Sequence, residues 1–149
     1  LPPGTGDMQL SMVQATEIDG AIIVTTPQDV AVLDAGKGLK MFEQVKVPVL
    51  GVIENMASFI CDSCDKEHHI FGQNGGKNMA ERLGVQYLGG IPLEIDVGRG
   101  SDQGQPYMTL MDKESRPTWN AFMSIAKKIH QGTPADSEKK GILGRLFNR

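Results

Sequence analysis

Two runs of apolar residues, separated by one helix-length segment, constrain the fold of this chain more than any other feature. The first run, 21–26, is continuous rather than alternating, is mostly β-branched with two threonines at its end, and stops at Pro27. The second, 49–53, follows Pro48. Such runs are typical of strands that are buried on both faces, as in parallel sheets. Between them the apolar spacing is helical, with Asp29 as the expected N-cap. The pattern predicts strand, helix, strand, and therefore an α/β fold built on a parallel sheet.

The rest of the chain continues this alternation of helices and strands. We expect a helix over 75–83, ended by a glycine, and a third short strand over 85–89. A polar, glycine-rich loop is expected over 96–106, followed by a helix that Ser115 caps and Gly132 ends. The apolar face of this last helix is predicted to consist of Trp119, Phe122, Met123, Ala126 and Ile129.

The ends of the predicted strands are where a ligand is expected. In open parallel sheets, ligands bind at the carboxyl ends of the strands. Three expected loops lie there, at 25–29, 54–55 and 90–93. Their residues are therefore the first candidates for a binding site.

Composition narrows the classes of function. A chain of 149 residues fits one domain, expected over 1–132, with a separate tail over 133–149. Fifteen Lys and Arg against eighteen Asp and Glu give a net charge of −3, so there is no global basic field for nucleic acid. No stretch reads as a secretory signal or as an apolar run long enough to span a bilayer. We expect a cytoplasmic protein that does not bind nucleic acid.

The segment 56–72 breaks the alternation and is interpreted as an insertion. It contains Cys61, Cys64, His68 and His69. Two thiolates at this spacing can hold one metal, but a complete site needs more ligands. Four interpretations follow: a zinc site completed by the two histidines, a redox disulfide, a cluster shared between two subunits, or inert thiols.

The residues on either side of the cysteine pair bear on this choice. The segments 58–60 and 67–70 predict a small hairpin. A thioredoxin-like CxxC instead follows a strand and begins a helix. The hairpin therefore disfavours the redox disulfide, while CxxC followed by histidine is common in small zinc sites.

The chain opens on the loop-like sequence Leu-Pro-Pro-Gly-Thr-Gly-Asp. Gly4 and Gly6 would let backbone N–H groups approach an anion, and Asp7 could hold a water or a metal-bound water. An ordinary tight turn would explain the same residues. Because this loop has no preceding element, we expect the chain to be the carboxy-terminal portion of a longer protein.

Several motifs occur together and in one order along the chain. They resemble the Mrp/ApbC family of deviant P-loop ATPases that carry iron–sulfur clusters, and the resemblance covers nearly all of 1–132. It implies a parallel sheet of the MinD-like, SIMIBI type of P-loop NTPase. The motifs are the opening Leu1–Asp7, Thr25-Thr26-Pro27-Gln28-Asp29-Val30-Ala31, Gly51-Val52-Ile53-Glu54-Asn55-Met56, Cys61-Asp62-Ser63-Cys64, Ile70-Phe71-Gly72 with Gly75-Gly76, Leu88-Gly89-Gly90-Ile91-Pro92-Leu93, and Ser101-Asp102-Gln103-Gly104-Gln105-Pro106.

The resemblance implies a nucleotide site. The opening loop would be switch II, with Gly4 and Gly6 near the γ-phosphate and Asp7 helping to order it. Asn55 would read the adenine edge, since an amide can donate and accept at once, and Pro92 would pack against the base. The glycine-rich phosphate loop and the aspartate for Mg²⁺ are absent from this sequence. ATP hydrolysis is therefore expected of a complete protein and not of this chain alone.

For the cysteine pair the resemblance implies a shared cluster. Cys61 and Cys64 of each protomer would meet the same pair of a partner across a two-fold axis, giving four thiolates for one [4Fe–4S] cluster in a homodimer. His68 and His69 would then be solvated. The implied function is the ATP-dependent transfer of that cluster to apo iron–sulfur proteins. The alternatives are a zinc-binding interaction module and a MinD-like membrane-associated ATPase.

The tail over 133–149 differs in composition from the rest. A helix there would place Ile142, Leu143, Leu146 and Phe147 on one face, among basic residues. This pattern predicts a weak amphipathic contact with the surface of the inner membrane, and it resembles the targeting tail of MinD. A solubilising tail or a helix packed on the domain are the alternatives.

Overall fold

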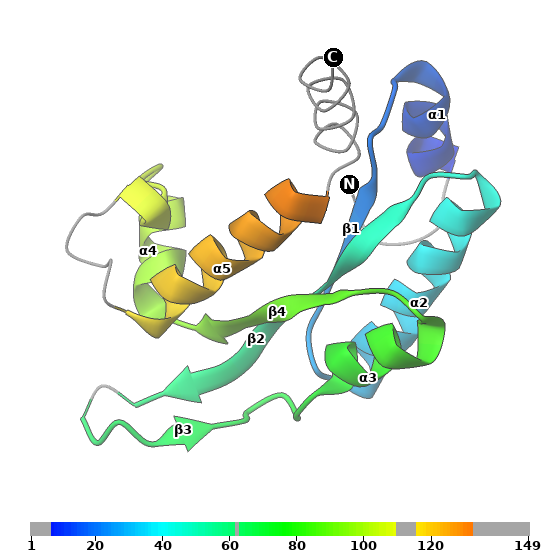
Figure 1. Ribbon diagram of the computed structural model, residues 1–149. Helices are drawn as coiled ribbons and strands as arrows, with labels where there is room; N and C mark the ends of the chain where they lie inside the picture. The colour runs from blue at the N-terminus through cyan, green and yellow to red at the C-terminus, as the bar shows by residue number, and fades with distance from the viewer. Residues whose placement is uncertain (1–6, 62, 110–115, 133–149) are drawn as a thin grey trace, which may run out of the picture.

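The computed structural model describes residues 7–61, 63–109 and 116–132, apart from the side chains of 7–10. Helices and strands alternate along the described chain as far as α4, apart from the hairpin that β2 forms with β3 (Figure 1). The elements in chain order are α1 (Asp7–Ala15), β1 (Ala21–Thr25), α2 (Asp29–Gln44), β2 (Val49–Ile60), β3 (Glu67–His68), α3 (Gly75–Leu83), β4 (Tyr87–Leu93), α4 (Ile95–Asp102), the 3₁₀ turn η1 (Tyr107–Thr109) and α5 (Pro117–Gly132).

The sheet is centred on β2. Strands β1 and β4 pair with it in parallel on either side, and β3 pairs antiparallel with its far end. Ile23 lies opposite Val52 in the first pairing, and Ile53 lies opposite Gly89 in the second. The predicted α/β fold with a parallel core is therefore confirmed. The predicted hairpin is also present, because Phe59 pairs with His68.

Helices cover both faces of the sheet, with α2 and α3 on one side and α5 on the other (Figure 1). Val52 is fully buried in the cluster beneath α2 and α3, together with Leu39 of α2. Its neighbour Ile53 belongs to the second cluster, which includes Ile125 of α5. Successive residues of a strand point to opposite faces. This is why the apolar run in β2 is continuous rather than alternating.

The strand ends differ from the sequence prediction. β2 continues to Ile60, so the first residues of the predicted insertion 56–72 extend this strand. The third strand covers Tyr87–Leu93 rather than 85–89 and therefore includes Pro92. Within the described sheet β4 pairs only with β2, and an edge strand tolerates a proline because one side of it needs no ladder hydrogen bonds. The positions 54–55 and 90–93, predicted as loops, are accordingly strand.

The predicted loop over 96–106 is also partly wrong, because its first half forms α4. The Ser101 hydroxyl donates a hydrogen bond to the Val97 carbonyl, 2.8 Å away. The chain then folds back so that the Gln105 N–H donates to the Gly100 carbonyl at 2.7 Å. A Cβ at Gly100 would lie 2.6 Å from the Gln105 carbonyl oxygen. The glycine that indicated a loop is thus required by a close approach at the end of a helix.

Two details of the predicted helices are corrected. Asp29 is the first residue of α2, and the N-cap is Gln28, whose side chain makes no capping hydrogen bond. In α5, Phe122 and Ile129 of the predicted face pack against the core as expected, but Ala126 is exposed and Ile125 is the buried residue instead. The Lys128 ammonium donates to the Leu88 carbonyl at 2.6 Å and so ties α5 to β4.

None of the helices in the described part is long and apolar enough to cross a membrane. The amphipathic tail, 133–149, and the predicted cap Ser115 lie outside the described residues.

Candidate functional site

The cysteine pair lies in a tight turn at the end of β2. The Cys61 N–H donates to the Lys66 carbonyl at 3.1 Å, and the Cys61 carbonyl accepts from the N–H groups of Cys64 at 3.3 Å and Asp65 at 2.8 Å. A bond between residues i and i+3 is typical of a β-turn, whose end Cα atoms lie within about 7 Å. The structure therefore places the two cysteines close together.

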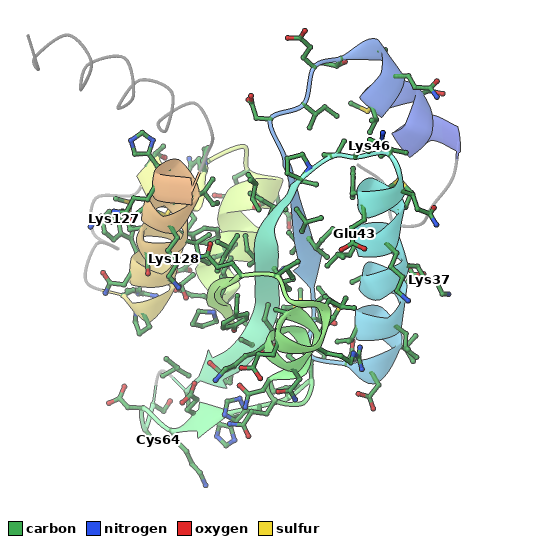
Figure 2. All side chains as sticks on the ribbon, turned by 45° about the vertical axis from the view of Figure 1, so that its right-hand side comes forward. Lys37, Glu43, Lys46, Cys64, Lys127 and Lys128 are labelled. Carbon is green, nitrogen blue, oxygen red and sulfur yellow. The ribbon has the colours of Figure 1, made fainter. Side chains whose placement is uncertain are left out.

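This turn projects away from the body of the molecule. β1 ends at Thr25, which pairs with Glu54, whereas β2 continues for six more residues to Ile60. The extension carries the turn past the end of β1, and β4 accompanies β2 only as far as the pairing of Phe59 with Leu93. Cys64 is exposed at its tip and Cys61 is partly buried (Figure 2). The pair is accessible to another protein molecule.

The two histidines do not gather around the cysteines. His68 is exposed on β3, opposite Phe59. The Nδ1 atom of His69 lies 3.0 Å from the Ala57 carbonyl oxygen, so this ring is bonded to β2. Within the described ranges, no group of three or more His, Cys, Asp or Glu residues could hold a metal ion. The zinc interpretation needs four ligands from one chain, and this geometry does not bring them together.

The two candidate adenine-binding residues lie on neighbouring strands. Asn55 of β2 pairs with Ile91 of β4, which places it beside Pro92. The Asn55 Oδ1 atom accepts the Met56 N–H at 3.0 Å. Met56 itself has a φ of +55°, so β2 is distorted immediately after Asn55. The structure thus places Asn55 and Pro92 on paired strands rather than in loops, one register position apart, and a joint contact with adenine stays a prediction.

The remaining candidate site residues lie at or before the first described residue of the chain. Gly4 and Gly6 lie outside the described residues. Asp7 is the first residue of α1, and its side chain is not among those described. The predicted contact of these three residues with a phosphate stays a prediction.

Glu54 lies in the expected loop 54–55, but the sequence indicated no role for its side chain, which the structure supplies. Its side chain is only 2% exposed, and its Oε2 atom accepts the Gly76 N–H at 2.5 Å. Gly76 is the second residue of α3, so the carboxylate lies at the positive end of that helix dipole. A Cβ at Gly76 would lie 3.1 Å from Thr25 Cγ2 and 3.2 Å from Glu54 Oε2. An acidic residue directly after the predicted strand 49–53 was the available signal.

Glu54→Ala is expected to reduce the free energy of unfolding by about 2 kcal/mol, because the N-terminus of α3 loses a charge-assisted hydrogen bond inside the protein. Glu54→Gln keeps an acceptor at the same place and should cost less. Urea titrations of both variants measure the difference. Equal stability of Glu54→Ala and the wild type would show that the bond contributes nothing.

The hairpin, α3 and the loop after β1 meet at Pro27. A Cβ on Gly75 would lie 2.2 Å from the Pro27 carbonyl oxygen, and a Cβ on Gly72 would lie 3.6 Å from the same atom. Gly72 also has a φ of +98°, which favours glycine. The returning arm of the hairpin and the start of α3 are therefore packed directly on the connection between β1 and α2.

A polar cluster fixes the chain that follows β4. The Tyr107 hydroxyl donates to Glu94 Oε2 at 2.7 Å. The Arg116 guanidinium donates to Glu94 Oε1 at 2.6 Å and to Asp96 Oδ2 at 3.3 Å. These bonds join the starts of α4 and α5 to the residue directly after β4, and so they hold the end of the strand that carries Pro92.

The two tyrosines of the chain are expected to ionise late. Burial, and secondly the charge of Glu54, raises the pKa of Tyr87 to about 12. Burial and the hydrogen bond to Glu94 raise the pKa of Tyr107 as well. A pKa that is higher in the folded than in the unfolded chain means that each neutral phenol favours folding. Because unfolded tyrosine titrates near pH ~10, this contribution to the free energy of unfolding is complete below that pH and is lost as the pH rises through the folded pKa values.

A titration followed by tyrosinate ultraviolet absorbance tests this expectation. In urea, both tyrosines should titrate with a pKa of about 10. The folded chain should show little tyrosine ionisation at that pH. Tyr87→Phe and Tyr107→Phe assign the two steps. A phenol that titrates normally in the folded chain would contradict the burial argument for that residue.

Comparisons with known proteins agree with this architecture. The model of the ParA family described as NUBPL iron-transfer P-loop NTPase matches residues 1–130. An iron-sulfur cluster carrier protein of Methanocaldococcus jannaschii is 47% identical over 129 residues, which are 86% of this chain and 43% of that protein. The chain spans about two fifths of the length of the curated relatives it matches.

Solved structures of similar proteins match the same fold. A nucleotide-binding protein of Archaeoglobus fulgidus, in complex with ADP, matches with a TM-score of 0.63 and 36% identity, over 80% of this chain and 46% of that one. The cell division ATPase MinD of Pyrococcus furiosus matches with a TM-score of 0.56 and 18% identity, over 76% of this chain and 43% of that one, and it supports the fold alone. With the family model matching almost the whole described chain, this chain belongs to the NUBPL iron-transfer group of ParA-type P-loop NTPases.

Proposed function

We propose that this chain holds an iron–sulfur cluster on Cys61 and Cys64 and passes it to apo iron–sulfur proteins. The observation that carries the proposal is the CxxC turn at the tip of the hairpin, with Cys64 exposed. Thiolates are the usual ligands of iron–sulfur clusters. The names of the relatives, which include iron-sulfur cluster carrier and transfer proteins, support the same cargo.

The cluster is proposed to be a [4Fe–4S] group shared by a homodimer. Each chain supplies two thiolates, and a four-iron cluster commonly takes four. A two-fold axis brings the same pair from a second copy, so that Cys61 and Cys64 of both chains complete the site. An exposed cargo site suits transfer, because the cysteines of an acceptor can reach the cluster.

Nucleotide is proposed to control this transfer. The relative from Archaeoglobus fulgidus is in complex with ADP. The amide of Asn55, one register position from Pro92, has an NH2 donor and an oxygen that can accept a second hydrogen bond besides the one from the Met56 N–H. ATP with Mg²⁺ would supply a binding energy that differs between two states of the dimer. Gly4, Gly6 and Asp7 are proposed to sense its γ-phosphate. A continuous strand, β2, joins Asn55 to the residue before Cys61.

The transfer itself is tested with an apo-enzyme whose activity requires a [4Fe–4S] cluster. The chain is loaded anaerobically, separated from free iron and sulfide, and mixed with that apo-enzyme in the presence of an iron chelator. We expect activity to return in proportion to the loaded chain and despite the chelator. Recovery that is no better than with free iron and sulfide, and that the chelator blocks, would contradict a carrier function.

A further inference from the structure

Two neighbouring side chains on α2 are the most exposed large apolar residues in the described part of the chain. Val30 is 81% exposed and Leu33 is 65% exposed. Residues three apart lie on the same face of a helix, so the two form one patch, which we call the α2 patch. It lines a shallow depression together with Gln28, Asp34 and Lys37. Single apolar residues are normal on a surface, and these two adjacent ones are the most exposed apolar feature of the described part.

The α2 patch lies at the same edge of the sheet as the cysteine turn. β1 runs parallel to β2, and its carboxyl end leads directly into the first turn of α2. The loop between them packs on the base of the hairpin, because a Cβ at Gly72 would lie 3.6 Å from the Pro27 carbonyl oxygen. The hairpin and the start of α2 occupy the same lower edge of the molecule in Figure 1.

We propose that the α2 patch is where a second copy of this chain packs when the two cysteine turns meet. This inference rests on the shared cluster proposed above. The cysteine turn brings two thiolates, and among the described residues they belong to no group of three or more potential ligands that could hold a metal ion. A second copy that completes the site must approach this edge, and Val30 and Leu33 would otherwise stay in water there.

The charges around the patch suit pairing with itself. Lys37 lies 3.8 Å from Asp34, and both side chains are at least half exposed. Asp29 lies one residue before Val30 and is also exposed. In a two-fold interface the same surface is used twice, so the lysine of one copy can face an aspartate of the other. A patch with both signs of charge around an apolar centre is therefore self-complementary.

The test compares the double variant Val30→Gln/Leu33→Gln with the control Ile95→Gln. Ile95 is 52% exposed at the start of α4 and lies outside the patch. Glutamine is a good helix former, so the fold should be kept, and circular dichroism checks this. Sedimentation equilibrium and iron content are measured on the apo and the reconstituted chain. We expect the dimer dissociation constant to rise about tenfold or more in the double variant and to be unchanged in the control.

The possible outcomes separate this inference from the proposed function. A double variant with the dissociation constant and iron content of the wild type would overturn the α2 patch as the contact and leave the shared cluster standing. A reconstituted wild type that is monomeric would overturn both the contact and the sharing. A dimer that the double variant weakens, but that holds no iron, would support the contact and contradict the cluster.

Discussion

The double variant Cys61→Ser/Cys64→Ser is expected to lose essentially all iron and acid-labile sulfide, from about two of each per chain in the wild type. Serine offers a hydroxyl in place of a soft thiolate, which iron–sulfur clusters require. Cys64 is exposed, and the turn is held by backbone hydrogen bonds that serine retains. Stability should therefore change by less than about 0.5 kcal/mol. Iron and sulfide assays after anaerobic reconstitution measure the loss.

Ser63→Ala is the matched control for this variant. Ser63 is exposed in the same turn, between the two cysteines, and is not expected to bind iron. Its iron content should equal that of the wild type. Normal iron and sulfide in the double cysteine variant would show that the cluster, if any, is held elsewhere.

Gly75→Ala is expected to destabilise the fold by about 3 kcal/mol or more. The new methyl group would lie 2.2 Å from the Pro27 carbonyl oxygen and 2.8 Å from its carbonyl carbon. Backbone atoms cannot rotate aside as a flexible side chain can, so α3 must move away from the loop after β1. Chemical denaturation measures the loss.

Gly98→Ala distinguishes this clash from the general effect of replacing a helical glycine. Gly98 lies inside α4, and a Cβ there would meet no heavy atom within 4 Å. In open helical positions this change stabilises by about 0.4–1 kcal/mol. Opposite signs for the two variants are the expected result. A stabilising Gly75→Ala would mean that α3 does not pack on Pro27 in solution.

The parallel core could be predicted because its signal is local. Val52 and Ile53 face different helix layers, so the strand is apolar at consecutive positions. The helix after β1 follows from its own apolar spacing. These features depend on residues that are neighbours in the sequence, and the prediction needed no knowledge of distant contacts.

The strand ends and α4 could not be predicted, because distant contacts decide them. β2 passes through a distortion at Met56, where the register also shifts, and then pairs with residues 67 and 68 of the hairpin. The start of α4 is fixed by Arg116, which lies 22 residues after its partner Glu94. A glycine-rich segment gives no local sign of such a partner.

The residues of the candidate site also fall into two groups: those that the sequence could identify, and those whose role depends on distant contacts. Cys61 and Cys64 were visible because their spacing carries the chemistry, and the hairpin around them was predicted from its two arms. The role of Glu54 could not be predicted, because the group it stabilises, the N–H of Gly76, lies 22 residues further along. The pairing of Asn55 with the strand of Pro92 likewise depends on the sheet.

Native mass spectrometry of the anaerobically reconstituted chain tests the central claim most directly, because it counts chains, iron and sulfide in one particle. The account predicts a dominant species of two chains with one [4Fe–4S] cluster, absent from Cys61→Ser/Cys64→Ser. A single chain that carries one zinc ion and does not exchange it for iron and sulfide would contradict the shared cluster.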